Sequence, residues 1–117
     1  MDVEKLQSNA RIASRLLKAM SNERRLLILC HLAQGECSVG QLESVVGLSQ
    51  SALSQHLARL RQDGLVATRR SAQTIYYSLA GDEARRIMQT LHDIYCVEAR
   101  PGGGPVETET QIAADKA

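Results

Sequence analysis

Two consecutive helical segments, each with its own start and stop signals, constrain the fold of this chain most. Ser38, with Gln41 three residues later, is typical of a capping box, and Gly47 is the residue type that ends a helix in the left-handed conformation. Ser49 predicts the start of a second helix, which Gly64 ends. Two short capped helices joined by so tight a turn are typical of a helix-turn-helix.

Helical periodicity predicts two further helices before this pair. Apolar residues at intervals of three and four favour a helix from about Val3 to Met20. Ser21 or Asn22 then caps a second helix, "NERRLLILCHLAQG", which Gly35 ends. Because the central run of this second helix is apolar nearly all round, we expect it to be the buried one.

A hairpin and a last helix are predicted after the pair. "LVATRR" and "TIYYSL" are short β-branched and aromatic runs separated by the polar "SAQ", which is the pattern of a β-hairpin with a basic tip. Asp82 and Glu83 favour the start of a helix that extends to about Val97. We therefore predict a mainly α fold with a small β-hairpin, a winged helix-turn-helix, over residues 1–99, followed by a disordered tail over residues 100–117.

Composition limits the chain to one small domain. With 117 residues, no Phe and no Trp, its core must consist of aliphatic side chains packed between helices. A core of this size gives modest stability, so we expect a homodimer that buries further apolar surface. No signal-peptide core and no run of about 18 apolar residues occurs, which favours a cytoplasmic protein without a membrane partner. The three cysteines are then expected to be thiols.

The second helix of the pair has an uncharged polar face. Steps of about 100° per residue place Leu53, Leu57 and Leu60 on its buried side. Serine, glutamine and arginine on the opposite side offer hydrogen-bonding groups to base edges and phosphates, and their modest size lets the helix enter a major groove. With the basic hairpin, this face predicts contacts to double-stranded DNA by Ser49, Gln50, Ser51, Ser54, Gln55, Arg59, Arg69, Arg70 and Gln73.

An ordinary solvated helix is the alternative for this polar face. A serine- and glutamine-rich helix on its own favours that alternative, whereas the capped helix before it and the basic hairpin after it favour DNA binding. His56 falls at the margin of the buried side. We expect it to be a packing or hydrogen-bonding residue rather than one that contacts bases.

Four stretches of the chain carry a family resemblance. They are "LKAMSNERRLLILCHL", "SVGQL", "LSQSALSQHLARLRQDGLVATRR" and "QTIYYSL", and the resemblance covers about Ala13 to Cys96. Together they resemble the ArsR/SmtB family of bacterial transcriptional repressors. The resemblance implies a dimer formed through the first and last helices, a recognition helix over Ser49 to Gln62, a wing over Leu65 to Leu79, and release of a pseudo-palindromic operator when an effector binds.

Metal sensing is disfavoured by the residues at the family's metal sites. Many members carry a "CxC" cysteine pair in the short helix before the recognition helix, where this chain has Ser38 and Gly40 in "GECSVGQL". A second family site uses carboxylates and histidines on the last helix, which here offers His92 with Asp93 and little else. We expect no resident metal or cofactor. A metal- or metalloid-responsive repressor remains an alternative, with Cys30, His31 and Cys37 as ligands.

The cysteines give a more specific resemblance. Cys30 in "LLILCHL" and Cys96 at the end of "LHDIYC" resemble the thiol pair of the sulfide- and redox-responsive SqrR-, BigR- and HlyU-like subgroup. The resemblance implies that reactive sulfur species join the two thiols through a di- or polysulfide bridge and so lower operator affinity. Alone, Cys30 would favour a small buried hydrophobic residue, and Cys37 a spare thiol.

Three other functions are weighed against this one. An enzyme is disfavoured because the chain lacks a "CxxC" motif, a phosphate-binding loop and a nucleophile elbow. A repressor that responds to peroxide would use the same two thiols and form a plain disulfide. A DNA-binding dimer without an effector site, in which all three cysteines are structural, is the remaining alternative.

Overall fold

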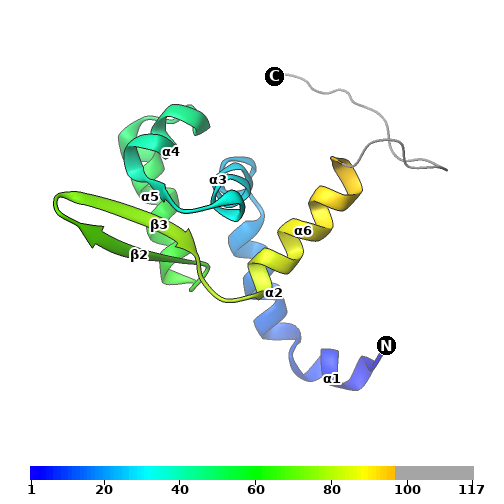
Figure 1. Cartoon of the computed structure of the whole chain (residues 1–117). Coiled ribbons are helices and arrows are strands. Elements are labelled where there is room, and N and C mark those ends of the chain that lie inside the picture. The colour runs from blue at the N-terminus through cyan, green and yellow to red at the C-terminus, as the bar shows by residue number, and fades with distance from the viewer. Residues whose placement is uncertain (97–117) are drawn as a thin grey trace. The chain divides into compact units, whose positions relative to one another are not determined.

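The computed structural model describes residues 1–96, so the predicted tail over residues 100–117 lies outside the described residues. The helices are α1 (Val3–Ser8), α2 (Ala10–Met20), α3 (Glu23–Gln34), α4 (Val39–Val46), α5 (Gln50–Gln62) and α6 (Glu83–Tyr95) (Figure 1). The strands are β1 (Cys37–Ser38), β2 (Val66–Ser71) and β3 (Thr74–Leu79). The chain divides into two compact units, Met1–Arg85 and a second that begins at Arg86.

The first predicted helix is interrupted at Asn9, so the expectation of one continuous helix from Val3 to Met20 is wrong. The hydroxyl of Ser8 and the side-chain amide of Asn9 both donate hydrogen bonds to the carbonyl oxygen of Lys5, each at 2.9 Å. Side chains of these types compete with the backbone for helix carbonyls. Accordingly α1 ends at Ser8 and α2 begins at Ala10.

The buried helix α3 has the predicted start and end. The side-chain oxygen of Asn22 accepts hydrogen bonds from the backbone N–H groups of Arg24 and Arg25, at 2.9 and 3.1 Å, and Gly35 follows the last helical residue. Its buried residues are Ile28, Leu29 and Leu32. The helix therefore supplies the centre of the core from one side only, because Leu27 and Cys30 in the same apolar run are exposed.

The predicted pair of capped helices is confirmed as α4 and α5. Ser38 and Gln41 form the reciprocal capping box, with bonds of 3.1 and 2.8 Å between each side chain and the other residue's backbone N–H. Gly47 ends α4 with φ 74°, a conformation that favours glycine. Ser49 starts α5 by accepting a hydrogen bond from the N–H of Ala52 at 3.1 Å.

The hairpin is also present, and it belongs to a three-stranded antiparallel sheet in the order β1-β3-β2. β2 pairs with β3 from Val66 opposite Leu79 to Ser71 opposite Thr74. β1 pairs with the other edge of β3, where Cys37 lies opposite Tyr77. This strand is missing from the sequence prediction because two residues carry no detectable alternation.

One core joins these elements within the first unit. Its fully buried large side chains are Ile28, Leu29 and Leu32 of α3, Leu42 of α4, and Leu53 and Leu60 of α5. α5 packs against α2, α3 and β2, which holds it with one side inward. The mainly helical winged helix-turn-helix predicted from the sequence is therefore the observed fold.

An apolar surface remains uncovered on the N-terminal helices. Leu6, Ile12 and Leu17 are each more than half exposed. A groove of about 480 Å³ runs along this surface and is lined by Leu6, Ala10, Ala13, Ser14, Leu17, Lys18 and Ser21. Across residues 1–96, no helix has the length and apolar character needed to span a bilayer.

Candidate nucleic-acid interface

The outward face of α5 is polar and open to solvent. The inward-facing Leu53, Leu57 and Leu60 are buried, so the opposite side of the helix is left exposed. All seven candidate residues predicted in and around α5 and at the hairpin tip are exposed: Ser49, Gln50, Ser51, Ser54, Gln55, Arg59 and Gln73. The structure thus presents a row of hydrogen-bonding side chains of the kind that can contact base edges.

Two of these side chains are also engaged within the helix. The hydroxyl oxygen of Ser49 accepts the capping bond from Ala52, so Ser49 sets the start of α5. The Nε of Arg59 donates to Asp63 at 2.8 Å, one helical turn further on. This ion pair directs the guanidinium of Arg59 toward the C-terminal end of α5.

The two wing arginines lie on opposite faces of the sheet. Arg69 is paired with Tyr76, and Arg70 is paired with Ile75. Since successive side chains of a strand alternate between faces, Arg70 shares the face of Tyr77, while Arg69 shares that of Tyr76. Sequence reasoning had grouped Arg69 and Arg70 as equivalent DNA contacts, and the register separates them.

Arg69 is held by two partners. Its Nε and Nη2 donate to the two carboxylate oxygens of Glu36, both at 2.8 Å. Its guanidinium carbon lies 4.6 Å from the centre of the Tyr76 ring. The hydrogen bond from the Arg69 guanidinium lowers the pKa of the Glu36 carboxyl group. The same hydrogen bond raises the pKa of Arg69.

A shallow groove of about 460 Å³ separates α5 from the wing. It is lined by Ser54, Ala58, Arg61 and Gln62 of α5 and by Tyr77 of β3. Arg61, Gln62 and Tyr77 are not among the residues predicted from the sequence. The groove therefore lies between the exposed face of α5 and the wing.

His56 lies at the edge of the inward face of α5 and is half-buried. Burial is the largest cause that lowers the pKa of its imidazole, and the charges of Arg25 and then Arg24 lower it further. His56 is therefore a neutral side chain in the folded protein at neutral pH. This agrees with the packing role expected from the sequence.

The depressed pKa of His56 predicts a pH dependence of stability. As the pH falls through the ordinary imidazole value of about 6.5, the unfolded chain takes up a proton that the folded chain resists, so the free energy of unfolding should decrease. Above that value the contribution of His56 should be complete. Urea unfolding between pH 5.5 and 7.5 measures this slope, and His56→Gln should flatten it. His92→Gln, at an exposed position of α6, is the control; an unchanged slope in His56→Gln would contradict the prediction.

The three cysteines are free thiols in different surroundings. Cys30 on α3 is exposed, which contradicts the alternative of a buried core residue, and Cys96 directly after α6 is also exposed. Cys37 is partly buried on β1, and burial raises the pKa of its thiol. Because the thiolate is the reactive form, the raised pKa lowers the reactive fraction of the Cys37 thiol at neutral pH. Among residues 1–96, no three His, Cys, Asp or Glu side chains are grouped as metal ligands.

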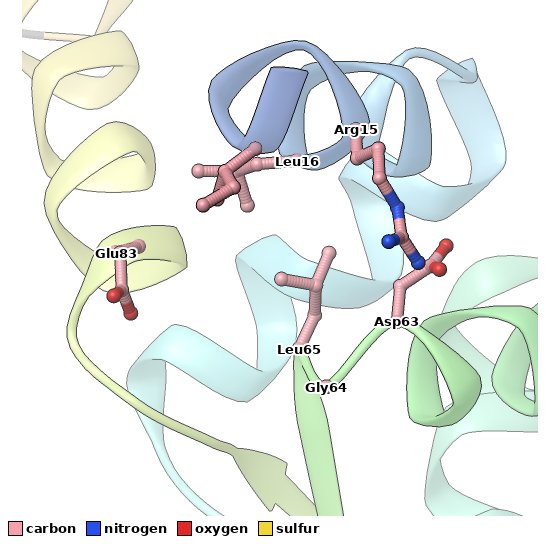
Figure 2. A pocket seen from close by; sticks show the side chains of 7 residues that line it. Arg15, Leu16, Asp63, Gly64, Leu65 and Glu83 are labelled. Atoms are coloured by element: carbon pink, nitrogen blue, oxygen red, sulfur yellow. The ribbon is translucent and has the colours of Figure 1, made fainter. Parts of the chain in front are cut away.

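A separate pocket of about 380 Å³ lies within the first unit, away from the polar face of α5. It is lined by Ile12, Arg15, Leu16, Asp63, Gly64, Leu65 and Glu83. Figure 2 shows Leu16 of α2 and Leu65 facing the same space, with Arg15 and Asp63 to one side and Glu83 to the other. None of its lining residues belongs to the predicted DNA contacts. The pocket borders the turn that connects α5 to β2.

Comparison with known proteins identifies the family. The model of the bacterial regulatory protein arsR family matches residues 22–68, which include α3, α4 and α5. The transcriptional activator HlyU of Vibrio cholerae is 54% identical over 96 residues, covering 82% of this chain and 89% of HlyU. The chain belongs to the ArsR family. It is therefore a DNA-binding transcriptional regulator.

Solved structures of other ArsR-family proteins resemble this regulator closely. The transcriptional repressor BigR from Xylella fastidiosa is 39% identical with a TM-score of 0.79, and the match covers 84% of this chain and 100% of the BigR chain. A homodimeric winged helix-turn-helix DNA-binding domain, Mb0332 from Mycobacterium bovis, is 33% identical with a TM-score of 0.68, covering 75% of this chain and 82% of that one. These likenesses agree with the winged helix-turn-helix fold of this ArsR-family regulator.

Proposed function

We propose that this ArsR-family regulator is a cytoplasmic repressor that senses reactive sulfur species through Cys30 and Cys96. The observation that carries the proposal is the contrast among its three thiols. Cys30 and Cys96 are exposed, whereas Cys37 is partly buried with a raised pKa. A sensing thiol must be accessible to its oxidant, and two such thiols are required to form and then resolve a persulfide.

The chemistry needs a sulfane sulfur donor of the persulfide class. The thiolate of one cysteine attacks the terminal sulfur of an organic persulfide and becomes a persulfide itself, while the donor leaves as a thiolate. Attack of the second cysteine thiolate on the inner sulfur expels hydrogen sulfide and forms a disulfide. In the balanced reaction, two thiols and one persulfide give a disulfide, one organic thiol and one hydrogen sulfide. If both cysteines are first persulfidated, the same displacement leaves a trisulfide.

The reduced form binds a pseudo-palindromic operator as a homodimer in this proposal. Support comes from the exposed apolar surface along α1 and α2, which a second copy would cover, and from the homodimeric Mycobacterium bovis relative. A two-fold dimer presents two copies of α5 to two half-sites. The outward face of α5 contacts bases, and the groove lined by Arg61, Gln62 and Tyr77 receives the phosphate backbone.

The test is operator affinity and intact mass measured together. An operator is first selected from random duplex DNA with the reduced protein, which is then treated separately with an organic persulfide, hydrogen peroxide and zinc. Persulfide should produce a Cys30 to Cys96 bridge, with or without extra sulfur, and weaken operator binding by about 5- to 150-fold, the range of a coupling of about 1 to 3 kcal/mol. Tryptic mass spectrometry identifies the bridged cysteines.

Cysteine variants make the outcome decisive. Cys30→Ser and Cys96→Ser should bind the operator as the unmodified protein does and lose the response, whereas the matched control Cys37→Ser should keep it. A response to peroxide alone, with a plain disulfide, would replace sulfur sensing by general redox sensing. Release by zinc alone would favour the metal-responsive alternative. Equal operator affinity of the reduced and bridged protein would rule out thiol control while leaving DNA binding intact.

A further inference from the structure

The ion pair between Glu36 and Arg69 joins the two edges of the sheet, which are 33 residues apart in the sequence. Glu36 directly precedes β1, and Arg69 lies on β2, on the far side of the central strand β3. The guanidinium of Arg69 crosses β3 over the ring of Tyr76, at 4.6 Å, and reaches both carboxylate oxygens of Glu36 at 2.8 Å. The three residues therefore brace the sheet across its full width.

The register places Arg69 and Tyr76 on the face of the wing that points away from the groove between α5 and Tyr77. Tyr77 lines the groove with α5, and Arg70 shares the face of Tyr77. Arg69 and Tyr76 occupy the other face, because side chains alternate along each strand. A phosphate backbone seated between α5 and the wing would meet Arg70 and Tyr77 before it could reach Arg69.

Two N–H groups of Arg69 are already bonded to Glu36 without DNA. A bidentate contact to a carboxylate uses the same planar fork that an arginine would use for a phosphate, and stacking on a ring fixes the plane of the guanidinium. A phosphate contact through these two N–H groups would have to replace the Glu36 carboxylate, and a contact through the other donors of Arg69 would place the phosphate near that negative charge. Both circumstances oppose a direct contact.

We propose that Arg69 is a wing-positioning residue rather than a DNA contact, and that Glu36 and Tyr76 are its partners in holding β2 at the angle from which Arg70 reaches a phosphate. Lysine cannot reproduce this role, since it lacks the fork and the flat stacking surface. The inference rests on operator binding through α5 and the wing, as in the proposed function. It revises the assignment of Arg69 made from the sequence.

The salt dependence of operator binding tests the proposal. Each phosphate contact that is lost reduces the slope of log K against log salt by about 0.9 for duplex DNA. Arg70→Gln should reduce the slope by about that amount. Arg69→Gln and Arg69→Lys should each weaken binding by about two- to tenfold, the effect expected for residues coupled in one network, and leave the slope unchanged. Glu36→Gln combined with Arg69→Gln should be no weaker than Arg69→Gln alone.

The opposite assignment gives different results in every measurement. If Arg69 contacts a phosphate, Arg69→Gln reduces the slope, Arg69→Lys keeps most of the affinity, and Glu36→Gln strengthens binding by freeing the guanidinium. Thermal unfolding of each variant verifies that the domain is folded, and hydrogen exchange of the β1 and β3 amides reports whether the sheet has loosened. If the protein without substitutions did not bind DNA at all, the result would instead contradict the proposed function.

Discussion

Replacing Leu53 by alanine should lower the free energy of unfolding by about 2 to 5 kcal/mol, the range for a leucine truncated in a packed core. Leu53 is completely buried on the inward face of α5, which packs against α2, α3 and β2. The loss includes both the transfer of the side chain and the cavity that remains. Because domains of this size are stable by only about 5 to 15 kcal/mol, a large part of the total would disappear.

Urea unfolding followed by circular dichroism measures this effect. Leu27→Ala is the matched control, since it deletes the same atoms from a leucine on α3 that is 38% exposed. The control should cost much less than Leu53→Ala. Equal losses at the two positions would show that α5 does not depend on Leu53 for its attachment to the core. Operator binding should decrease in Leu53→Ala only as far as the folded fraction does.

Replacing Gln55 by alanine should weaken operator binding by about 1 to 3 kcal/mol, the discrimination provided by a good bidentate contact to a base. Gln55 is exposed in the middle of the outward face of α5, where its amide can pair with the major-groove edge of an adenine. The domain should remain as stable as before, because the side chain contributes nothing to the core.

The specific and non-specific affinities separate this role from general electrostatics. Gln55→Ala should reduce affinity for the selected operator and leave binding to a scrambled duplex unchanged, with relaxed preference at a single base position. Gln34→Ala, at an exposed position at the end of α3, is the control and should affect neither affinity. Equal loss on both duplexes would assign Gln55 to the phosphate backbone instead.

Local signals explain why the helix boundaries could be predicted from the sequence. The capping bonds of Ser38 and Ser49 connect residues three positions apart, so the residues that decide each boundary stand next to it in the sequence. The break at Asn9 is equally local but was missed. Ser8 and Asn9 are tolerated within helices, and only the hydrogen bonds they make to Lys5 reveal that they end one.

Long-range partners explain what could not be predicted about the site. Periodicity along α5 was sufficient to predict its exposed polar face, since burial of one side determines the other. The pairing of Glu36 with Arg69 joins positions 33 residues apart and left no signal in either segment. The placement of Tyr77 beside Arg61 and Gln62 likewise depends on how β3 packs, which the sequence of the hairpin alone does not specify.

The turn after α5 joins the helix directly to the wing, which has a consequence for the proposed regulation. Gly64, with φ 76°, and the hydrogen bond from the N–H of Leu65 to the carbonyl of Leu60, at 2.9 Å, close the helix immediately before β2 begins at Val66. Because Leu65 and Val66 are both buried, the junction between α5 and the wing is anchored in the core. In the proposed function, an effector then has no need to change the conformation of α5 or of the wing. A change in the spacing between the two protomers of the proposed dimer is sufficient. Each protomer should therefore still bind an isolated half-site after the full operator has been released.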